Sequence, residues 1–241
     1  AVIERYARFS SLGGITRGEQ GLVASMNLRW LTHYIRQRQV LATEAVRYNF
    51  APTSHDPLAQ SMGTFTFAFD SDRNVWECLG EKETGAQTFV LPAGVDITRD
   101  VGIPAAWEEI CRTGIESDKP ITVTLQPIMA KGGRGQTNRA LLPAGQYRLT
   151  LLMLDRDAAP EPRAFEVWIE VRREPSAAQR AAADRVEFTG GRDAANQILT
   201  RSYPLELHPP GSVTVTLKPV RGKAILCGVV LEPVSGDDNK R

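Results

Sequence analysis

The sequence has no long apolar run, few cysteines and little net charge, and each shortage excludes a class of protein. It contains no stretch of about 18 apolar residues and no basic segment followed by an apolar one. Neither a membrane span nor an uncleaved signal peptide is therefore predicted. The formal net charge of +1 argues against a nucleic-acid partner, because no overall positive field would attract a polyanion.

Cysteine is scarce as well. Cys78, Cys111 and Cys227 are the three cysteines, and no two of them form a CxxC pair, so neither a zinc site nor a dense disulfide framework is predicted. Cys227 lies in an apolar run, where a buried free thiol is expected. Pairing of Cys78 with Cys111 stays open, and no cofactor is expected. The cysteines do not settle the compartment, and an extracytoplasmic one is favoured.

The 241 residues are 42% apolar and 24% charged, as in an ordinary globular protein. Residues 1–45 are predicted to be a helical extension, because apolar residues recur at helical spacing between positions 19 and 40. Within it, Trp30 and Tyr34 are candidates for docking on a partner. Residues 46–234 are predicted to form one β-sandwich domain, and residues 235–241 a flexible tail.

From Val46 onward, short β-branched and aromatic runs alternate with turn residues, which is typical of an antiparallel β-sandwich. The predicted strands are Val46–Phe50, Thr64–Phe69, Thr88–Leu91, Ile121–Gln126, Gln146–Leu154, Ala164–Arg172, Arg185–Phe188, Ser202–Leu207, Ser212–Pro219 and Ala224–Glu232. A short helix is predicted over 104–113, with Pro104 in its first turn. Residues 175–184 are interpreted as a surface helix or a mobile connection.

Four segments carry a family resemblance: Leu142–Leu151 (LPAGQYRLTL), Arg163–Ile169 (RAFEVWI), Gly211–Leu217 (GSVTVTL) and Gly222–Glu232 (GKAILCGVVLE). Their succession resembles malectin-like domains of the galactose-binding-like jelly-roll group. With Val46–Pro52 as the opening strand, the resemblance spans about residues 48–234. It implies a jelly-roll sandwich that binds a carbohydrate through loops at one end.

A sugar site needs an aromatic face and planar polar side chains, because each buried hydroxyl must find a partner. Trp76 follows a polar turn and is the candidate aromatic residue, with Asp72 and Asn74 as polar partners. The alternative is that residues 75–79 are the return strand of a hairpin with Trp76 in the core. His55 and Asp56 are further candidates for ligand binding, with a plain turn as the alternative.

Two further polar segments are candidate binding sites, a basic loop and a pair of aspartates. Lys131, Arg134 and Arg139 lie in a glycine-rich loop, which would bind an anion or an acidic partner unless it is only a solvated hairpin loop. Asp155 and Asp157 are expected in a solvated turn; a structural calcium there is left open without support.

Trp107 and Trp168 are expected to pack, Trp168 on the strand face opposite Phe165 and Val167. No catalytic motif is found, so the chain is not expected to be an enzyme. Two functions are therefore considered. The first is a non-catalytic, carbohydrate-binding recognition module. The second is an accessory subunit of a larger protein assembly, docked through its N-terminal helix and the sandwich surface.

Overall fold

The computed structural model describes one part of the chain, which lies within the second of two units, residues 40–241. The described residues are 45–50, 66–72, 74–126, 128–129, 138–139, 141–156, 163–173, 178–188 and 196–234. No helix among them is long and apolar enough to cross a membrane. The predicted N-terminal helix and C-terminal tail lie outside these residues.

The described part is built mainly of strands, with two short helices. The strands are β1 (Val46–Phe50), β2 (Thr66–Phe69), β3 (Val75–Leu79), β4 (Gln87–Val90), β5 (Thr113–Ser117), β6 (Ile121–Leu125), β7 (Ile128–Met129), β8 (Asn138–Arg139), β9 (Gly145–Asp155), β10 (Ala164–Arg173), β11 (Ala178–Glu187), β12 (Gln197–Leu207), β13 (Gly211–Arg221), β14 (Ala224–Leu226) and β15 (Gly228–Pro233), and the helices are α4 (Glu81–Thr84) and α5 (Ala106–Cys111).

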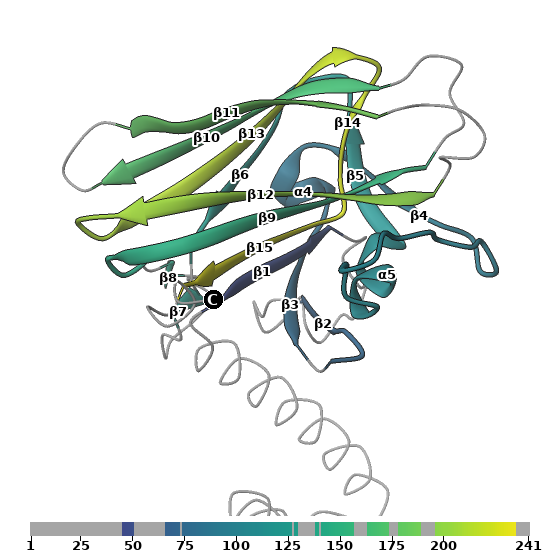
Figure 1. Cartoon of the computed structure of the whole chain (residues 1–241), viewed down its shortest axis with the longest axis horizontal. Helices are drawn as coiled ribbons and strands as arrows, with labels where there is room; N and C mark the ends of the chain where they lie inside the picture. The colour runs from purple at the N-terminus through teal and green to yellow at the C-terminus, as the bar shows by residue number, and fades with distance from the viewer. Residues whose placement is uncertain are drawn as a thin grey trace, which may run out of the picture. The chain divides into compact units, whose positions relative to one another are not determined.

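Two large sheets form the sandwich, as Figure 1 shows. The six-stranded sheet has the order β12-β9-β15-β1-β3-β2, and the four-stranded sheet has the order β11-β10-β13-β6. A three-stranded sheet, β14-β5-β4, lies beside them. Every described strand pair is antiparallel except β1 with β3. The predicted antiparallel β-sandwich is confirmed.

Alternating burial explains why these segments form half-buried strands. In β6, Ile121, Val123 and Leu125 are buried while Thr122 and Thr124 are exposed, because successive side chains point to opposite faces of a sheet. The buried side chains of both large sheets belong to one hydrophobic core. Tyr48 of β1 donates its hydroxyl proton to the carbonyl oxygen of Gln126, after β6, at 2.9 Å. This hydrogen bond joins the two large sheets.

The predicted last strand, 224–232, is in fact two strands. The chain bends at Cys227, so that β14 belongs to the three-stranded sheet and β15 to the six-stranded one. At the bend, Gly228 allows α5 to approach closely. A Cβ atom there would lie 3.1 Å from Ile110 of α5 and 3.2 Å from the Trp76 ring.

Residues 178–187 form strand β11, so the helix or mobile connection predicted for 175–184 is wrong over the described residues. Alanine favours helix, but β11 pairs with β10 along almost its whole length. At its end, Val186 and Phe188 are buried, and the Phe188 ring lies 5.9 Å from that of Phe165. Pairing and burial therefore override the local preference.

The helix predicted over 104–113 is confirmed in a shorter form as α5. Strand β5 follows it directly and was not predicted. Gly114 lies in β5, where a Cβ atom would stand 2.6 Å from the Phe89 ring and 2.9 Å from the carbonyl oxygen of Leu226. Only a residue without a side chain fits between β4 and β14 at this position.

Candidate functional site

The polar turn nominated as a sugar-binding loop is the corner of the β2–β3 hairpin. Trp76 is completely buried, and its indole Nε1 donates to Asp70 Oδ2 at 2.9 Å. Asn74 donates its backbone N–H and its side-chain amide to the two oxygens of the same carboxylate, at 2.8 and 3.0 Å. The hairpin alternative therefore describes Trp76 correctly, because the Asp70 carboxylate allows the indole N–H to be buried. Its ring is not exposed at a loop mouth.

The remaining predicted site residues have different outcomes. Asp72 is exposed at the tip of this hairpin. His55, Asp56, Trp30, Tyr34, Lys131 and Arg134 lie outside the described residues. Arg139 lies in the short strand β8, of which only the backbone is described. Asp72, His55, Asp56 and the basic loop thus stay predictions.

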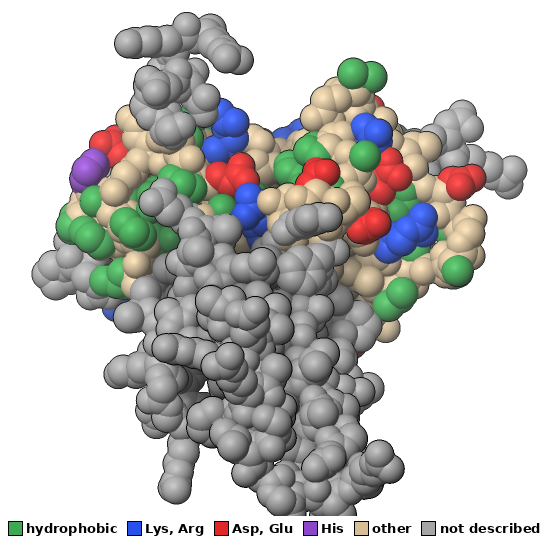
Figure 2. Space-filling model, turned by 90° about the horizontal axis from the view of Figure 1, so that it is seen from below, with side chains coloured by type: hydrophobic (Ala, Val, Ile, Leu, Met, Phe, Trp, Pro, Cys, Tyr) green, Lys and Arg blue, Asp and Glu red, His purple; other side chains and the backbone are tan. Residues whose placement is uncertain are grey.

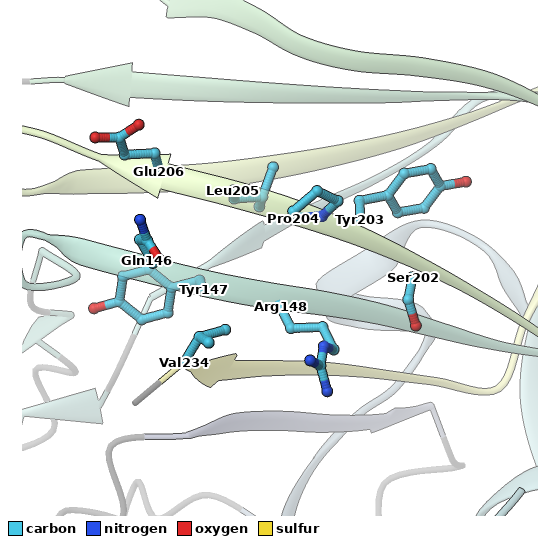
Figure 3. Close-up of a pocket in the computed structure, with 9 residues that line it drawn as sticks. All are labelled: Gln146, Tyr147, Arg148, Ser202, Tyr203, Pro204, Leu205, Glu206 and Val234. Carbon is cyan, nitrogen blue, oxygen red and sulfur yellow. The ribbon is translucent and has the colours of Figure 1, made fainter. Parts of the chain in front are cut away.

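A hollow of about 500 Å³ lies along β9 and β12 of the six-stranded sheet. It is lined by Gln146, Tyr147, Arg148, Ser202, Tyr203, Pro204, Leu205, Glu206 and Val234. Figure 3 shows Gln146 beside Glu206 at one end, Ser202 and Tyr203 toward the other, and Arg148 between them. A volume of this size is within the range of pockets that hold small molecules.

The register of β9 and β12 places these polar side chains together. Pro204 pairs with Arg148, and Glu206 pairs with Gln146. All four are exposed, whereas the intervening Tyr147 is buried and donates its hydroxyl proton to the carbonyl oxygen of Pro143 at 2.9 Å. The outward positions therefore form the polar lining, and the inward positions hold the strands in the core.

Hydrogen bonds and an ion pair fix the floor and margin of this face. The hydroxyls of Thr150 and Ser202 share a hydrogen bond of 2.9 Å across β9 and β12. On the β15 side, Arg47 and Glu232 form an ion pair of 2.6 Å. Figure 2, seen from below, shows positive and negative side chains intermixed on the described part of that side of the molecule.

A second polar cluster ties several elements together around the buried carboxylate of Glu116 on β5. Lys223 Nζ lies 3.0 Å from it, Arg156 Nη2 3.4 Å and Arg163 Nη1 3.5 Å. Burial raises the pKa of Glu116, but the hydrogen bond from Lys223 and the three positive charges outweigh burial and lower the pKa overall. The guanidinium of Arg156 also lies 4.7 Å from the centre of the Phe89 ring.

A hydrogen bond joins the two large sheets at the edge where β12 and β11 lie. Tyr203 of β12 donates its hydroxyl proton to Asp184 of β11 at 2.9 Å, and Arg201 lies 4.0 Å from the same carboxylate. Burial and this hydrogen bond raise the pKa of Tyr203 well above its usual range. Tyr203 thus forms part of the wall behind the hollow and links it to the opposite sheet.

The prediction for Asp155 is wrong. Asp155, expected in a solvated turn, is buried at the end of β9, where its carbonyl oxygen accepts the backbone N–H of Asn196. No group of three His, Cys, Asp or Glu residues that could hold a metal ion occurs among the described residues.

Trp107 packs against the core as expected. Trp168 is half-exposed on the outer face, with the guanidinium of Arg180 4.2 Å from its ring centre.

The three cysteines are free and buried, as expected for Cys227. Cys227 shares a side-chain hydrogen bond with Cys111, the last residue of α5. Burial first, and then this hydrogen bond, raise the pKa of the Cys227 thiol. A buried thiol with a raised pKa is a poor nucleophile, so Cys227 serves packing.

Sequence reasoning missed the hollow because it searched loops for aromatic residues. A signal was present: polar residues alternate with apolar ones at 146–149 and 202–207, which places Gln146, Arg148, Ser202 and Glu206 on outward faces. Which strands would be neighbours could not be read from this alternation. The site therefore depended on the pairing of β9 with β12.

No family model and no curated protein matches the sequence. Solved structures match: the plant receptor-like kinase ANX2 is 10% identical and covers 79% of this chain and 48% of that chain at a TM-score of 0.51. The ANXUR1 extracellular domain from Arabidopsis thaliana is 12% identical, with coverages of 79% and 48% and a TM-score of 0.50.

The chain thus spans about half the length of these matched chains. Both neighbours are ectodomains of malectin-like receptor kinases. At such identities the likeness shows the fold alone: it confirms the β-sandwich, and it is consistent with the malectin-like resemblance of the segments between Leu142 and Glu232.

Proposed function

We propose that this chain is a non-catalytic recognition module that binds a carbohydrate in the hollow that lies over β9 and β12. The observation that carries the proposal is the combination of a hollow of about 500 Å³ with polar side chains mounted on paired strands. Strands hold side chains more rigidly than loops, so these groups are preorganised for a ligand. Loop residues such as Asp72 are not needed for this site.

The polar lining has the mixture of donors and acceptors that sugar hydroxyls require. A hydroxyl both donates and accepts, and so do the groups of Gln146 and Ser202. Arg148 only donates, and ionised Glu206 only accepts. Pro204 and Val234 add apolar surface against which the C–H groups of a sugar ring can lie. Together these residues can satisfy neighbouring hydroxyls of one sugar.

The same lining supports recognition rather than hydrolysis. Glycoside hydrolysis commonly uses two carboxyl groups that flank the scissile bond. Among the described residues that line the hollow, Glu206 is the one carboxylate. We therefore propose that the protein binds and releases a saccharide without hydrolysing it.

An extracytoplasmic location is part of the proposal. Its support is that the ANX2 and ANXUR1 structures of the same fold are an ectodomain and an extracellular domain. Fractionation of the native cells, with the chain detected by antibody, tests it. Recovery with the cytoplasmic fraction alone would overturn this part and leave the hollow untouched.

The test of binding is an oligosaccharide array followed by calorimetric titration with the best binder. Arg148→Ala and Glu206→Gln should each weaken binding by about tenfold or more, because each removes a charged hydrogen bond worth roughly 1.5–3 kcal/mol. Both residues are exposed, so the fold should persist, which circular dichroism checks. Lys119→Ala and Asp96→Asn, exposed positions outside the hollow's lining, are matched controls expected to be silent. Failure of every saccharide to bind would overturn the proposal.

A further inference from the structure

The outer face of the four-stranded sheet carries a half-exposed tryptophan between two cations. Trp168 lies on β10, with the guanidinium carbon of Arg180 4.2 Å and Lys218 Nζ 5.2 Å from its ring centre. Arg180 comes from β11 and Lys218 from β13, the two neighbours of β10 in the sheet. Three adjacent strands thus contribute to one cluster, on the layer that Figure 1 shows opposite the hollowed sheet.

This cluster of Trp168, Arg180 and Lys218 holds its charged groups in place. A cation over an indole face is attracted by the negative face of the ring, and a stacked guanidinium has fewer orientations to lose on binding. Among the described residues, no ion pair within 4.0 Å joins Arg180 or Lys218 to a carboxylate. Their N–H groups can therefore meet a carboxylate from outside.

The outward residues around the cluster are small or polar. On one side, Trp168 pairs with exposed Ala183; on the other it pairs with Thr216, whose hydroxyl lies 3.3 Å from that of Thr122. A second hydroxyl pair, Thr124 with Thr214, also measures 3.3 Å. With strands about 4.8 Å apart and a rise of about 3.3 Å per residue, the face covers roughly 500 Å².

Shape and residue type together favour a protein partner over a small ligand. Small ligands bind in concave sites, whereas the outer face of a sheet with an area of this size corresponds to the centre of an interface of about 800 Å² per partner. Tryptophan and arginine are the residues that most often dominate interface energies. β10 and β13 are paired on both sides, so side chains rather than an added strand must make the contacts.

We infer that the Trp168–Arg180–Lys218 cluster is a docking site for a protein surface that bears carboxylates. Three acidic residues share the face: Glu166 pairs with Arg185 and Lys218, Glu170 pairs with Arg180, and Glu187 forms an ion pair with Arg185 at 2.8 Å. They oppose an acidic partner and restrict where it can lie. An incoming carboxylate is thereby directed to the two cations beside the ring.

A fluorescent deca-glutamate peptide, titrated at low salt by anisotropy, tests this docking site on the full chain. Trp168→Ala and Arg180→Gln should each weaken binding at least fivefold, and Trp168→Phe should stay within about twofold because a phenyl face also holds a guanidinium. Glu170→Gln should tighten binding, since a repelling charge is removed. Lys119→Gln, the same loss of charge elsewhere, should change little.

Three results would overturn the inference. The first is a silent Trp168→Ala, and the second is a loss with Lys119→Gln as large as that with Arg180→Gln. The third concerns competition for the labelled peptide. It is the finding that an acidic saccharide, oligogalacturonate, displaces the fluorescent peptide at a lower concentration, counted per negative charge, than unlabelled deca-glutamate does. Arg148→Ala should leave deca-glutamate binding unchanged, so failure here and failure of the hollow are distinguishable.

Discussion

The two large sheets present different outer faces to solvent. Along β9 and β12 the surface is hollowed, and donors and acceptors alternate around a space large enough for a small molecule. On β10, the indole ring of Trp168 lies close to two cations, Arg180 and Lys218. Both faces arise from the same alternation of buried and exposed side chains. The outward residues of a sandwich can therefore differ from sheet to sheet, because the inward residues alone maintain the core.

The largest expected effects come from changes in the shared interior. Gly114→Ala introduces a Cβ atom 2.6 Å from the Phe89 ring, and such overpacking costs about 1–3 kcal/mol of unfolding free energy. Urea denaturation measures this loss. Under conditions in which the variant remains folded, the ratio of its affinity for the saccharide to its affinity for deca-glutamate should match that of the wild type. An unchanged unfolding midpoint would contradict the close packing of β4, β5 and β14.

The Glu116 cluster separates core electrostatics from both faces. Glu116→Gln should lower the unfolding free energy at neutral pH by about 1–3 kcal/mol, because charged hydrogen bonds are lost. The folded-state pKa of Glu116 is lowered, so its contribution is present above its unfolded value of 4.5 and is lost as pH falls through the folded pKa. Denaturation from pH 7 downward should show the two proteins converging. A gap that stays constant with pH would contradict the cluster's role.

Tyr203→Phe tests whether the faces are mechanically linked. It removes the hydrogen bond to Asp184 between the two large sheets and should cost about 0.5–1.5 kcal/mol. The folded pKa of Tyr203 is raised, so in the wild type this contribution is complete below the unfolded pKa of 10.0 and declines above it. Thermal melts at neutral pH measure the cost. A larger change in saccharide binding than in deca-glutamate binding would place the effect in the hollow.

The smallest expected effect comes from a change on the outer face of the four-stranded sheet, near Trp168. Thr122→Val removes one hydroxyl of an exposed pair, and its effect on stability should stay within about 0.5 kcal/mol. It should weaken deca-glutamate binding by no more than about twofold and leave saccharide binding unchanged. Parallel titrations of both probes check this. A clear loss at the hollow would show that the two faces are coupled.

Most of the fold could be predicted because its strands carry a strong alternating pattern. Val46–Phe50 was predicted with its observed bounds, and Ile121–Leu125 within one residue. Strand β11 was predicted only at its end, as Arg185–Phe188; residues 178–184 were missed, since their alanines favour a helix and their strand form depends on pairing with β10. The break at Cys227 was missed because an apolar run shows no sign of a change of sheet.

The site was harder to predict than the fold, for a physical reason. A sequence shows which residues share a strand face, but the hollow requires Arg148 and Pro204 to be cross-strand partners, although 56 positions separate their numbers (204 minus 148). Trp76 was nominated from its polar neighbours. Those neighbours instead provide Asp70, whose carboxylate satisfies the buried indole N–H.

The most direct test of the account is backbone amide NMR of the full chain titrated with the best-binding oligosaccharide. If the saccharide binds in the hollow, the shifted amides should cluster at 146–150 and 202–206, and the amides around Trp168 should not move. Shifts confined to the 70–76 hairpin, or to the face of β10 and β13, would contradict it.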